Sequence, residues 1–190
     1  MKTNFTLWIF ILITATGLAE DIRPVPWITE GAISFLEAFL EEHPSAKILE
    51  FGSGASTIWF AKKNVTLYSV EHNIEWHEKI NNLLENNNSG SFVNYFLRSL
   101  PYYDISNEFP DEFFDLILVD GRNRKGCICF SLSKLKKGGI MMLDNAERPY
   151  YFSVFKHMAG WLRFDAPQER PDSCGFYYPN WLTTWWIKPE

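Results

Sequence analysis

Short apolar runs alternate along most of the chain with stretches whose apolar residues recur at helical spacing. The runs that predict strands are Lys47–Phe51, Thr66–Val70, Phe92–Leu97, Phe114–Val119 and Ile140–Leu143. The helical spacing predicts helices over residues 28–43, 56–62, 74–84, 122–137 and 151–158, with Gly138 and Gly139 ending the fourth. Strands that alternate with helices in this way are typical of an α/β layer structure with a mostly parallel sheet.

The C-terminal part of the chain departs from this alternation. Trp161–Phe164 and Thr183–Ile187 read as two more strands, with a proline-rich loop between them. Such a pair closes the sheet as an antiparallel edge. We therefore expect a doubly wound, mostly parallel, seven-stranded α/β sheet with an antiparallel C-terminal edge, formed by a single domain over residues 20–190.

The first 19 residues have a different pattern. Lys2 precedes an apolar core over Phe5–Ile13, and Gly17 and Ala19 are small residues suited to a cleavage site. This pattern predicts a secretory signal peptide, with a short membrane anchor through residues 5–19 as the alternative. We expect the secretory pathway or a membrane if residues 1–19 act as a signal, and the cytoplasm otherwise.

Composition narrows the function classes. The 190 residues are 46% apolar and 17% aromatic, enough for one well-packed core. The net charge is -5 and no basic block is visible, which argues against a nucleic-acid partner. Cys127 and Cys129 are spaced as C-x-C, which matches neither a redox motif nor a zinc knuckle, so free or buried thiols are expected.

Acidic residues stand at the ends of the predicted strands. Glu71, Asp120 and Asp144 each follow an apolar run, and Glu50 lies one residue before the end of the first run. Because ligands of doubly wound folds bind at the carboxyl ends of the strands, these acids are candidate site residues.

A glycine turn follows the first strand. Gly52 and Gly54 suit a tight turn that a ligand approaches closely, but Thr57 stands where a dinucleotide-binding fingerprint has its third glycine. Glu71 lies 19 residues beyond Gly52, near the spacing at which an acid binds ribose hydroxyls. That spacing is shared by NAD and S-adenosylmethionine sites.

Four motifs, the last of them made of two segments, together resemble class I S-adenosylmethionine-dependent methyltransferases. Glu50–Thr57 resembles the first motif of that family, Tyr68–His72 its second-strand motif and Asp115–Gly121 its fourth. Leu135–Ile140 and Leu143–Asn145 are similar to its fifth-strand region, so the match covers about residues 27–160. The resemblance implies the Rossmann-like methyltransferase fold and S-adenosylmethionine as cofactor.

The resemblance also implies roles for individual residues. Glu50 would receive the ammonium group of the cofactor, Glu71 would hold the ribose hydroxyls, and His72 would lie beside the adenine. The full set of implied cofactor-binding residues is Glu50, Gly52, Ser53, Gly54, Ser56, Thr57, Glu71, His72 and Asp120.

Asp120, Asp144 and Asn145 are the implied catalytic residues. Their positions are similar to those of the three oxygen ligands of Mg²⁺ in catechol-type O-methyltransferases, and oxygen ligands suit that ion. The other reading makes Asp120 a cofactor or acceptor contact without a metal. Arg122 and Arg124, which follow Asp120, either bind an acidic or polar acceptor or start a helix in water.

The expected function is methyl transfer from S-adenosylmethionine, to an oxygen of a small-molecule or sugar acceptor. One alternative is a non-catalytic S-adenosylmethionine-binding protein of the same fold, and another is an NAD-linked oxidoreductase. Among the aromatic residues, Trp27 is the candidate for the site. It precedes the first helix, which can cover the cofactor in the folds that this chain resembles. Trp185 and Trp186 are expected to fill the core beneath an edge strand.

Overall fold

The computed structural model describes residues 22–86, 92–171 and 177–190. The predicted signal or anchor over residues 1–19 lies outside these ranges, as does Cys174. Within them, no helix is long and apolar enough to cross a membrane.

The strands form one seven-stranded sheet in the order β3-β2-β1-β4-β5-β7-β6. Their bounds are β1 (Lys47–Phe51), β2 (Thr66–Glu71), β3 (Phe92–Leu97), β4 (Phe114–Val119), β5 (Leu135–Leu143), β6 (Leu162–Pro171) and β7 (Tyr177–Ile187). The first five are parallel, and β7 pairs antiparallel with both β5 and β6. The predicted fold class, with its antiparallel C-terminal edge, is confirmed.

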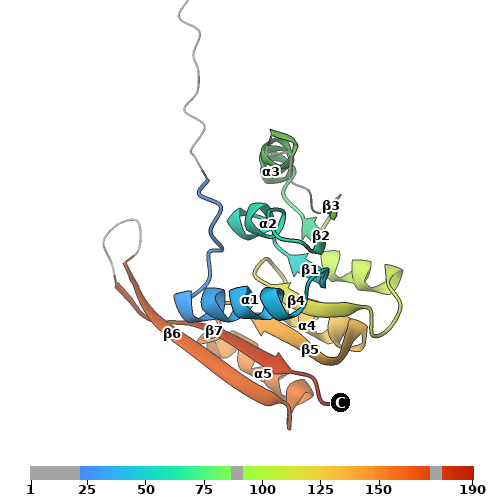
Figure 1. The fold of residues 1–190 in the computed structure, drawn as a ribbon. Helices are drawn as coiled ribbons and strands as arrows, with labels where there is room; N and C mark the ends of the chain where they lie inside the picture. The colour runs from blue at the N-terminus through green and yellow to red at the C-terminus, as the bar shows by residue number, and fades with distance from the viewer. Residues whose placement is uncertain (1–21, 87–91, 172–176) are drawn as a thin grey trace, which may run out of the picture.

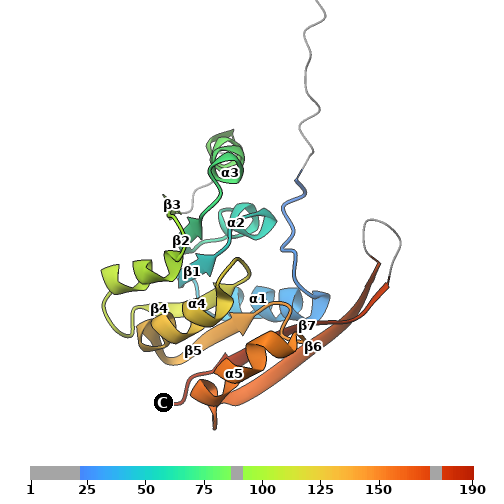
Figure 2. The ribbon, with the colours of Figure 1, turned by 180° about the vertical axis from the view of Figure 1, so that it is seen from behind.

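Helices cover both faces of the sheet, as Figures 1 and 2 show from opposite sides. The α-helices are α1 (Glu30–Glu42), α2 (Ala55–Phe60), α3 (Ile74–Asn86), α4 (Arg124–Ser131) and α5 (Phe152–Phe155). Short 3-10 turns are η1 (Tyr102–Glu108), η2 (Leu132–Lys134), η3 (Pro149–Tyr151) and η4 (Lys156–Met158).

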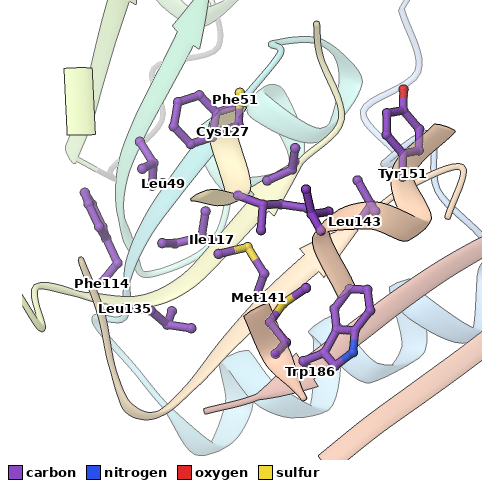
Figure 3. Close-up of a cluster of buried hydrophobic side chains, with 14 of the residues drawn as sticks. Leu49, Phe51, Phe114, Ile117, Cys127, Leu135, Met141, Leu143, Tyr151 and Trp186 are labelled. Atoms are coloured by element: carbon purple, nitrogen blue, oxygen red, sulfur yellow. The ribbon is translucent and has the colours of Figure 1, made fainter. Parts of the chain in front are cut away.

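Alternating side chains of the central strands build a core on each face. One cluster joins β1, β4 and β5 to η1, α4 and α5, and Figure 3 shows it with Leu49, Phe51, Ile117, Met141 and Trp186 among its labelled side chains. The opposite cluster packs Ile48, Leu116 and Met142 against residues of α1 and α2. Because side chains of a strand point alternately to its two faces, Trp185 and Trp186 fall in opposite clusters, both buried as predicted.

The predicted helix to residue 137 is wrong at its C-terminal end. Helix α4 ends at Ser131, one 3-10 turn follows, and β5 begins at Leu135, so Gly138 and Gly139 lie inside a strand. Gly138 has φ +69°, and the register between β4 and β5 shifts between Phe114 and Leu116. The glycine pair therefore serves an irregularity at the start of a strand and does not end a helix.

The C-terminal hairpin is longer than predicted. The prediction of strands over 161–164 and 183–187 missed most of β6 and β7, because the prolines read as a loop. Pro167 and Pro171 lie in β6, which is the outermost strand of the sheet. An edge strand tolerates proline because one row of its backbone groups has no strand partner.

Candidate functional site

The carboxyl ends of β1, β2, β4 and β5 lie along one edge of the sheet and border two adjoining cavities. Their volumes are about 570 and 580 Å³, within the usual range of small-molecule sites. Trp27, Ser53, Trp76 and Asp120 line both. Trp27, the aromatic candidate from the sequence, is 69% exposed there.

The turn after β1 requires glycine at position 52. Gly52 has φ +94°, and a Cβ added to it would lie 2.4 Å from the Cα of Gly121, in the turn after β4. A Cβ on Gly121 would lie 2.1 Å from the hydroxyl of Tyr102. The two glycines thus let the turns after β1 and β4 touch. Gly54 differs, since a Cβ there would meet only Trp76, at 3.9 Å.

Glu50 is fully buried beneath the glycine turn. Its carboxyl accepts hydrogen bonds from Ser56 Oγ at 2.5 Å, Thr57 Oγ1 at 2.6 Å and Ser69 Oγ at 2.5 Å. Burial raises the pKa of Glu50 to about 7 from 4.5, although the three hydroxyls oppose that shift. Thr57 also accepts the Gly54 N–H at 2.8 Å, so its hydroxyl joins Glu50 to the turn.

Sequence reasoning gave Glu50 the cofactor ammonium, and Ser56 and Thr57 a cofactor contact. In the structure, the side chains of Ser56 and Thr57 donate hydrogen bonds to Glu50. Glu50 and Thr57 line neither cavity, whereas Ser56 lines the first. Their geometry therefore makes Glu50 and Thr57 supports of the glycine turn.

Glu71 ends β2 at the wall of the second cavity. One carboxylate oxygen accepts the backbone N–H groups of His72 and Asn73, both at 2.8 Å. The other accepts the N–H and hydroxyl of Ser53, each at 3.2 Å. Glu71 thus fastens the glycine turn to the end of β2. His72, the predicted adenine neighbour, lines the same cavity.

Two aromatic residues that the sequence reasoning missed hold Ser53 in place. Trp76 in α3 donates its indole N–H to the Ser53 carbonyl at 2.8 Å. The Tyr95 hydroxyl lies 2.6 Å from Ser53 Oγ, and its ring stacks on His77 at 4.1 Å between centroids. The position of Trp76 four residues after His72, the end of the second-strand motif, was the signal available in the sequence.

Arg124 occupies the space between the ends of β4 and β5. Its guanidinium donates to the backbone carbonyls of Gly121 at 2.9 Å, of Asp120 at 2.6 Å and of Asp144. Its nitrogens also lie 3.1 Å from Asp120 Oδ1 and 4.0 Å from Asp144 Oδ2. A buried cation of the protein therefore stands between the two predicted catalytic acids.

The predicted Mg²⁺ site does not fit this arrangement. Asp144 Oδ1 accepts the indole N–H of Trp181 at 3.0 Å and the hydroxyl of Thr183 at 2.7 Å, and its other oxygen faces Arg124. Asn145 has φ +52° and lines neither cavity. Among the described residues, no group of three or more histidine, cysteine, aspartate or glutamate side chains is placed to hold a metal.

Asp120 is the acid of this edge that lines both cavities. Its side chain is 23% exposed. Burial and the neighbouring Asp144 raise the pKa of Asp120 well above its usual value, and Arg124 opposes the rise. The same burial raises the pKa of Asp144. A carboxylate with a raised pKa is a better proton acceptor than an ordinary aspartate.

The comparisons with known proteins bear on the fold. The sequence matches no protein-family model, and the search of curated proteins found no match. Among solved structures, a methyltransferase-like protein from Silicibacter pomeroyi is 22% identical, with a TM-score of 0.63 over 89% of this chain and 91% of its own.

Two further structures are similar over most of both chains. A putative caffeoyl-CoA O-methyltransferase from Staphylococcus aureus has a TM-score of 0.65 at 12% identity, covering 86% of each chain. A precorrin-6y C5,15-methyltransferase from Geobacter metallireducens has a TM-score of 0.64 at 14% identity, covering 82% of this chain and 86% of its own. The chain has the Rossmann-like fold of class I S-adenosylmethionine-dependent methyltransferases.

Proposed function

We propose that the chain is an S-adenosylmethionine-dependent methyltransferase that acts on an oxygen atom of a small molecule. The observation that carries the proposal is the pair of hydrogen bonds that Ser53 donates to Glu71, at the wall of a cavity of about 580 Å³. In the doubly wound fold, this place at the ends of neighbouring strands is where a nucleoside-like ligand binds.

The residues of the cavity suit this cofactor. A ribose hydroxyl can replace the Ser53 hydroxyl, which lies at 3.2 Å, as a donor to the carboxylate of Glu71, and the ring of His72 is a flat surface for adenine. Gly54 lines the adjoining first cavity, and only Trp76 lies within 4 Å of a Cβ added to it, so a ligand that reaches from one cavity to the other has room against this backbone. When bound, S-adenosylmethionine supplies a methyl group on a positively charged sulfur.

The chain's own residues then have two tasks, to position the acceptor and to take its proton. Asp120 is the proposed base, since its carboxyl lines both cavities and has a raised pKa. Arg124 is the proposed positioning residue, because it ties the turns after β4 and β5 together through their carbonyls. Positioning of this kind accounts for much of the acceleration of a displacement reaction.

Titration calorimetry with S-adenosylmethionine and S-adenosylhomocysteine tests the proposal directly. We expect both to bind, and we expect Glu71→Ala to weaken both at least tenfold. Glu75→Ala is the matched control, because it removes an exposed acid from the first turn of α3. If neither ligand binds a folded sample at high micromolar concentration, the proposal is refuted.

Turnover separates the remaining alternatives. A screen with S-adenosylmethionine that carries a labelled methyl group should transfer the label to a hydroxylated acceptor, and Asp120→Asn should reduce transfer without reducing cofactor binding. Binding without transfer to any acceptor would identify a non-catalytic binding protein. Binding of NAD in place of S-adenosylmethionine would identify an oxidoreductase.

A further inference from the structure

Three arginines line the second cavity. Arg122 and Arg124 follow the end of β4, and Arg148 follows the end of β5. This grouping stands out in a chain of net charge -5. The three differ in how far the protein itself uses their charge.

Arg124 binds other groups of the protein itself. It is only 8% exposed, and its guanidinium contacts three backbone carbonyls and the carboxylate of Asp120. These contacts use its donors and most of its charge, so it is not the group that meets a ligand.

The guanidinium groups of Arg122 and Arg148 make far fewer contacts with the described part of the protein. Arg122 is exposed, and its guanidinium has no ion pair or hydrogen bond with any residue in the ranges 22–86, 92–171 and 177–190. Arg148 is 54% exposed, and its nearest carboxylate oxygen, on Glu147, is 3.8 Å away. The other oxygen of Glu147 accepts the backbone N–H of Leu182. Two guanidinium groups therefore stand at the cavity with unused donors.

Their place in the fold assigns them to one end of the cavity. Glu71 and His72 belong to the end of β2, whereas Arg122 and Arg148 follow β4 and β5, which lie on the far side of β1 in the sheet. Asp120 stands at the end of β4, on the same side of β1 as the arginines. A ligand group bound by the arginines is thus on the side of the proposed base, away from the proposed ribose contact.

An aromatic side chain completes this end. Tyr150 lines the cavity and is 68% exposed, and Lys125 Nζ lies 4.1 Å from its ring centroid. Lys125 thus places a further positive charge at a ring that lines the cavity together with the arginines. A tyrosine face beside cations suits a flat organic body that carries negative charge.

We propose that the acceptor carries an anionic oxyacid group, a carboxylate or a phosphate, which Arg122 and Arg148 bind at the cavity. The inference rests on the proposed methyltransferase function and deepens it by naming the chemical class of the acceptor. Arginine suits this task because its planar guanidinium donates two parallel hydrogen bonds to a carboxylate or phosphate.

The test measures binding to the protein saturated with S-adenosylhomocysteine. The probes are inorganic phosphate and the pair para-hydroxybenzoate and para-hydroxybenzamide, which differ in charge and hardly in shape. We expect the anions to bind and the amide to bind at least tenfold more weakly than the benzoate. Added salt should weaken only the anions, because it screens charge.

The variant is Arg122→Gln/Arg148→Gln. It should weaken the anions at least tenfold and leave the amide unchanged. The matched control is Lys62→Gln/Lys137→Gln, which removes the same charge from exposed positions that line neither cavity. Equal losses in the two double variants would overturn the inference, as would anions that bind no better than the amide.

One further arm excludes the cofactor as the source of the anion. If the arginines held the carboxylate of the cofactor, the variant would weaken S-adenosylhomocysteine but not methylthioadenosine, which lacks the amino-acid part, and the inference would fail. If wild-type protein does not bind S-adenosylhomocysteine at all, the proposed function fails first. Binding of phosphate but not benzoate, or the reverse, identifies which oxyacid the site takes.

Discussion

Two glycines of one turn should respond to alanine in opposite ways. At Gly52 the added Cβ would lie 2.4 Å from the Cα of Gly121, and the backbone has φ +94°. A positive φ costs an L-residue about 1–2 kcal/mol, and overpacking adds about 1–3 kcal/mol. Gly52→Ala should therefore destabilise the fold by about 2–5 kcal/mol.

Gly54→Ala should leave the fold intact and damage binding. The backbone at Gly54 is extended, with φ 170°, and an added Cβ has one neighbour within 4 Å, Trp76 Cζ2 at 3.9 Å. Alanine should therefore cost no stability, and it restricts the unfolded chain more than glycine does. The new methyl group would fill space beside the first cavity, so the affinity for S-adenosylhomocysteine should fall at least tenfold.

Urea unfolding and titration calorimetry on the two variants separate these effects. Unfolding should be shifted in Gly52→Ala and unchanged in Gly54→Ala, whereas the loss of ligand affinity should be seen in folded Gly54→Ala. Wild-type stability in Gly52→Ala would refute the contact between the turns after β1 and β4. Wild-type affinity in Gly54→Ala would refute the placing of the cofactor against this backbone.

Three further predictions concern the buried charges. Because the pKa of Glu50 is raised to about 7 from 4.5, the folded state holds a proton between these two values that the unfolded state releases. The free energy of unfolding should therefore fall by about 3 kcal/mol as the pH rises from below 4.5 to above 7. Glu50→Gln should remove that fall, as urea unfolding at pH values on either side of the window would measure. Ser69→Ala removes one hydroxyl donor from Glu50 and should cost about 1–3 kcal/mol above the window, but less in the Glu50→Gln background, as a double-mutant cycle would measure. Arg124→Met leaves Asp120 and Asp144 as buried like charges and should destabilise the protein by about 3–5 kcal/mol at neutral pH; a loss under about 1 kcal/mol would contradict the bridging role.

The sequence predicts the central part of the fold because local signals and tertiary packing agree there. The run Phe114–Val119 is apolar on both faces apart from Asp115, and β4 is buried on both faces over its other residues. Gly138 and Gly139 are the opposite case, because a glycine pair after a helical pattern indicates a helix end. Pairing of β5 with β4 and β7 overrode that local signal.

The partners of the site residues could not be predicted from the sequence. Ser69 reaches Glu50 from the neighbouring strand, and Arg124 reaches Asp144 across 20 positions of sequence, so each contact depends on which strands are adjacent. Asn123, with φ +50°, starts α4 just before Arg124, and helical periodicity does not reveal such a conformation. The sequence thus supplied the candidate residues, and the sheet order decided what they touch.

The four acids at this edge have the same chemistry but different surroundings, and those surroundings separate their roles. Glu50 and Asp144 line neither cavity, and their oxygens are engaged by hydroxyls, an indole and a guanidinium. Glu71 lines the second cavity, but both of its oxygens accept hydrogen bonds from the glycine turn and the end of β2. Asp120 lines both cavities, and Arg124 is the one side-chain partner of its carboxyl within the described residues. A base must have a lone pair that reaches the acceptor, and only the surroundings of Asp120 leave one beside both cavities. Asp120 is therefore the proposed base because of what its neighbours leave open, which the position of an acid at a strand end does not reveal.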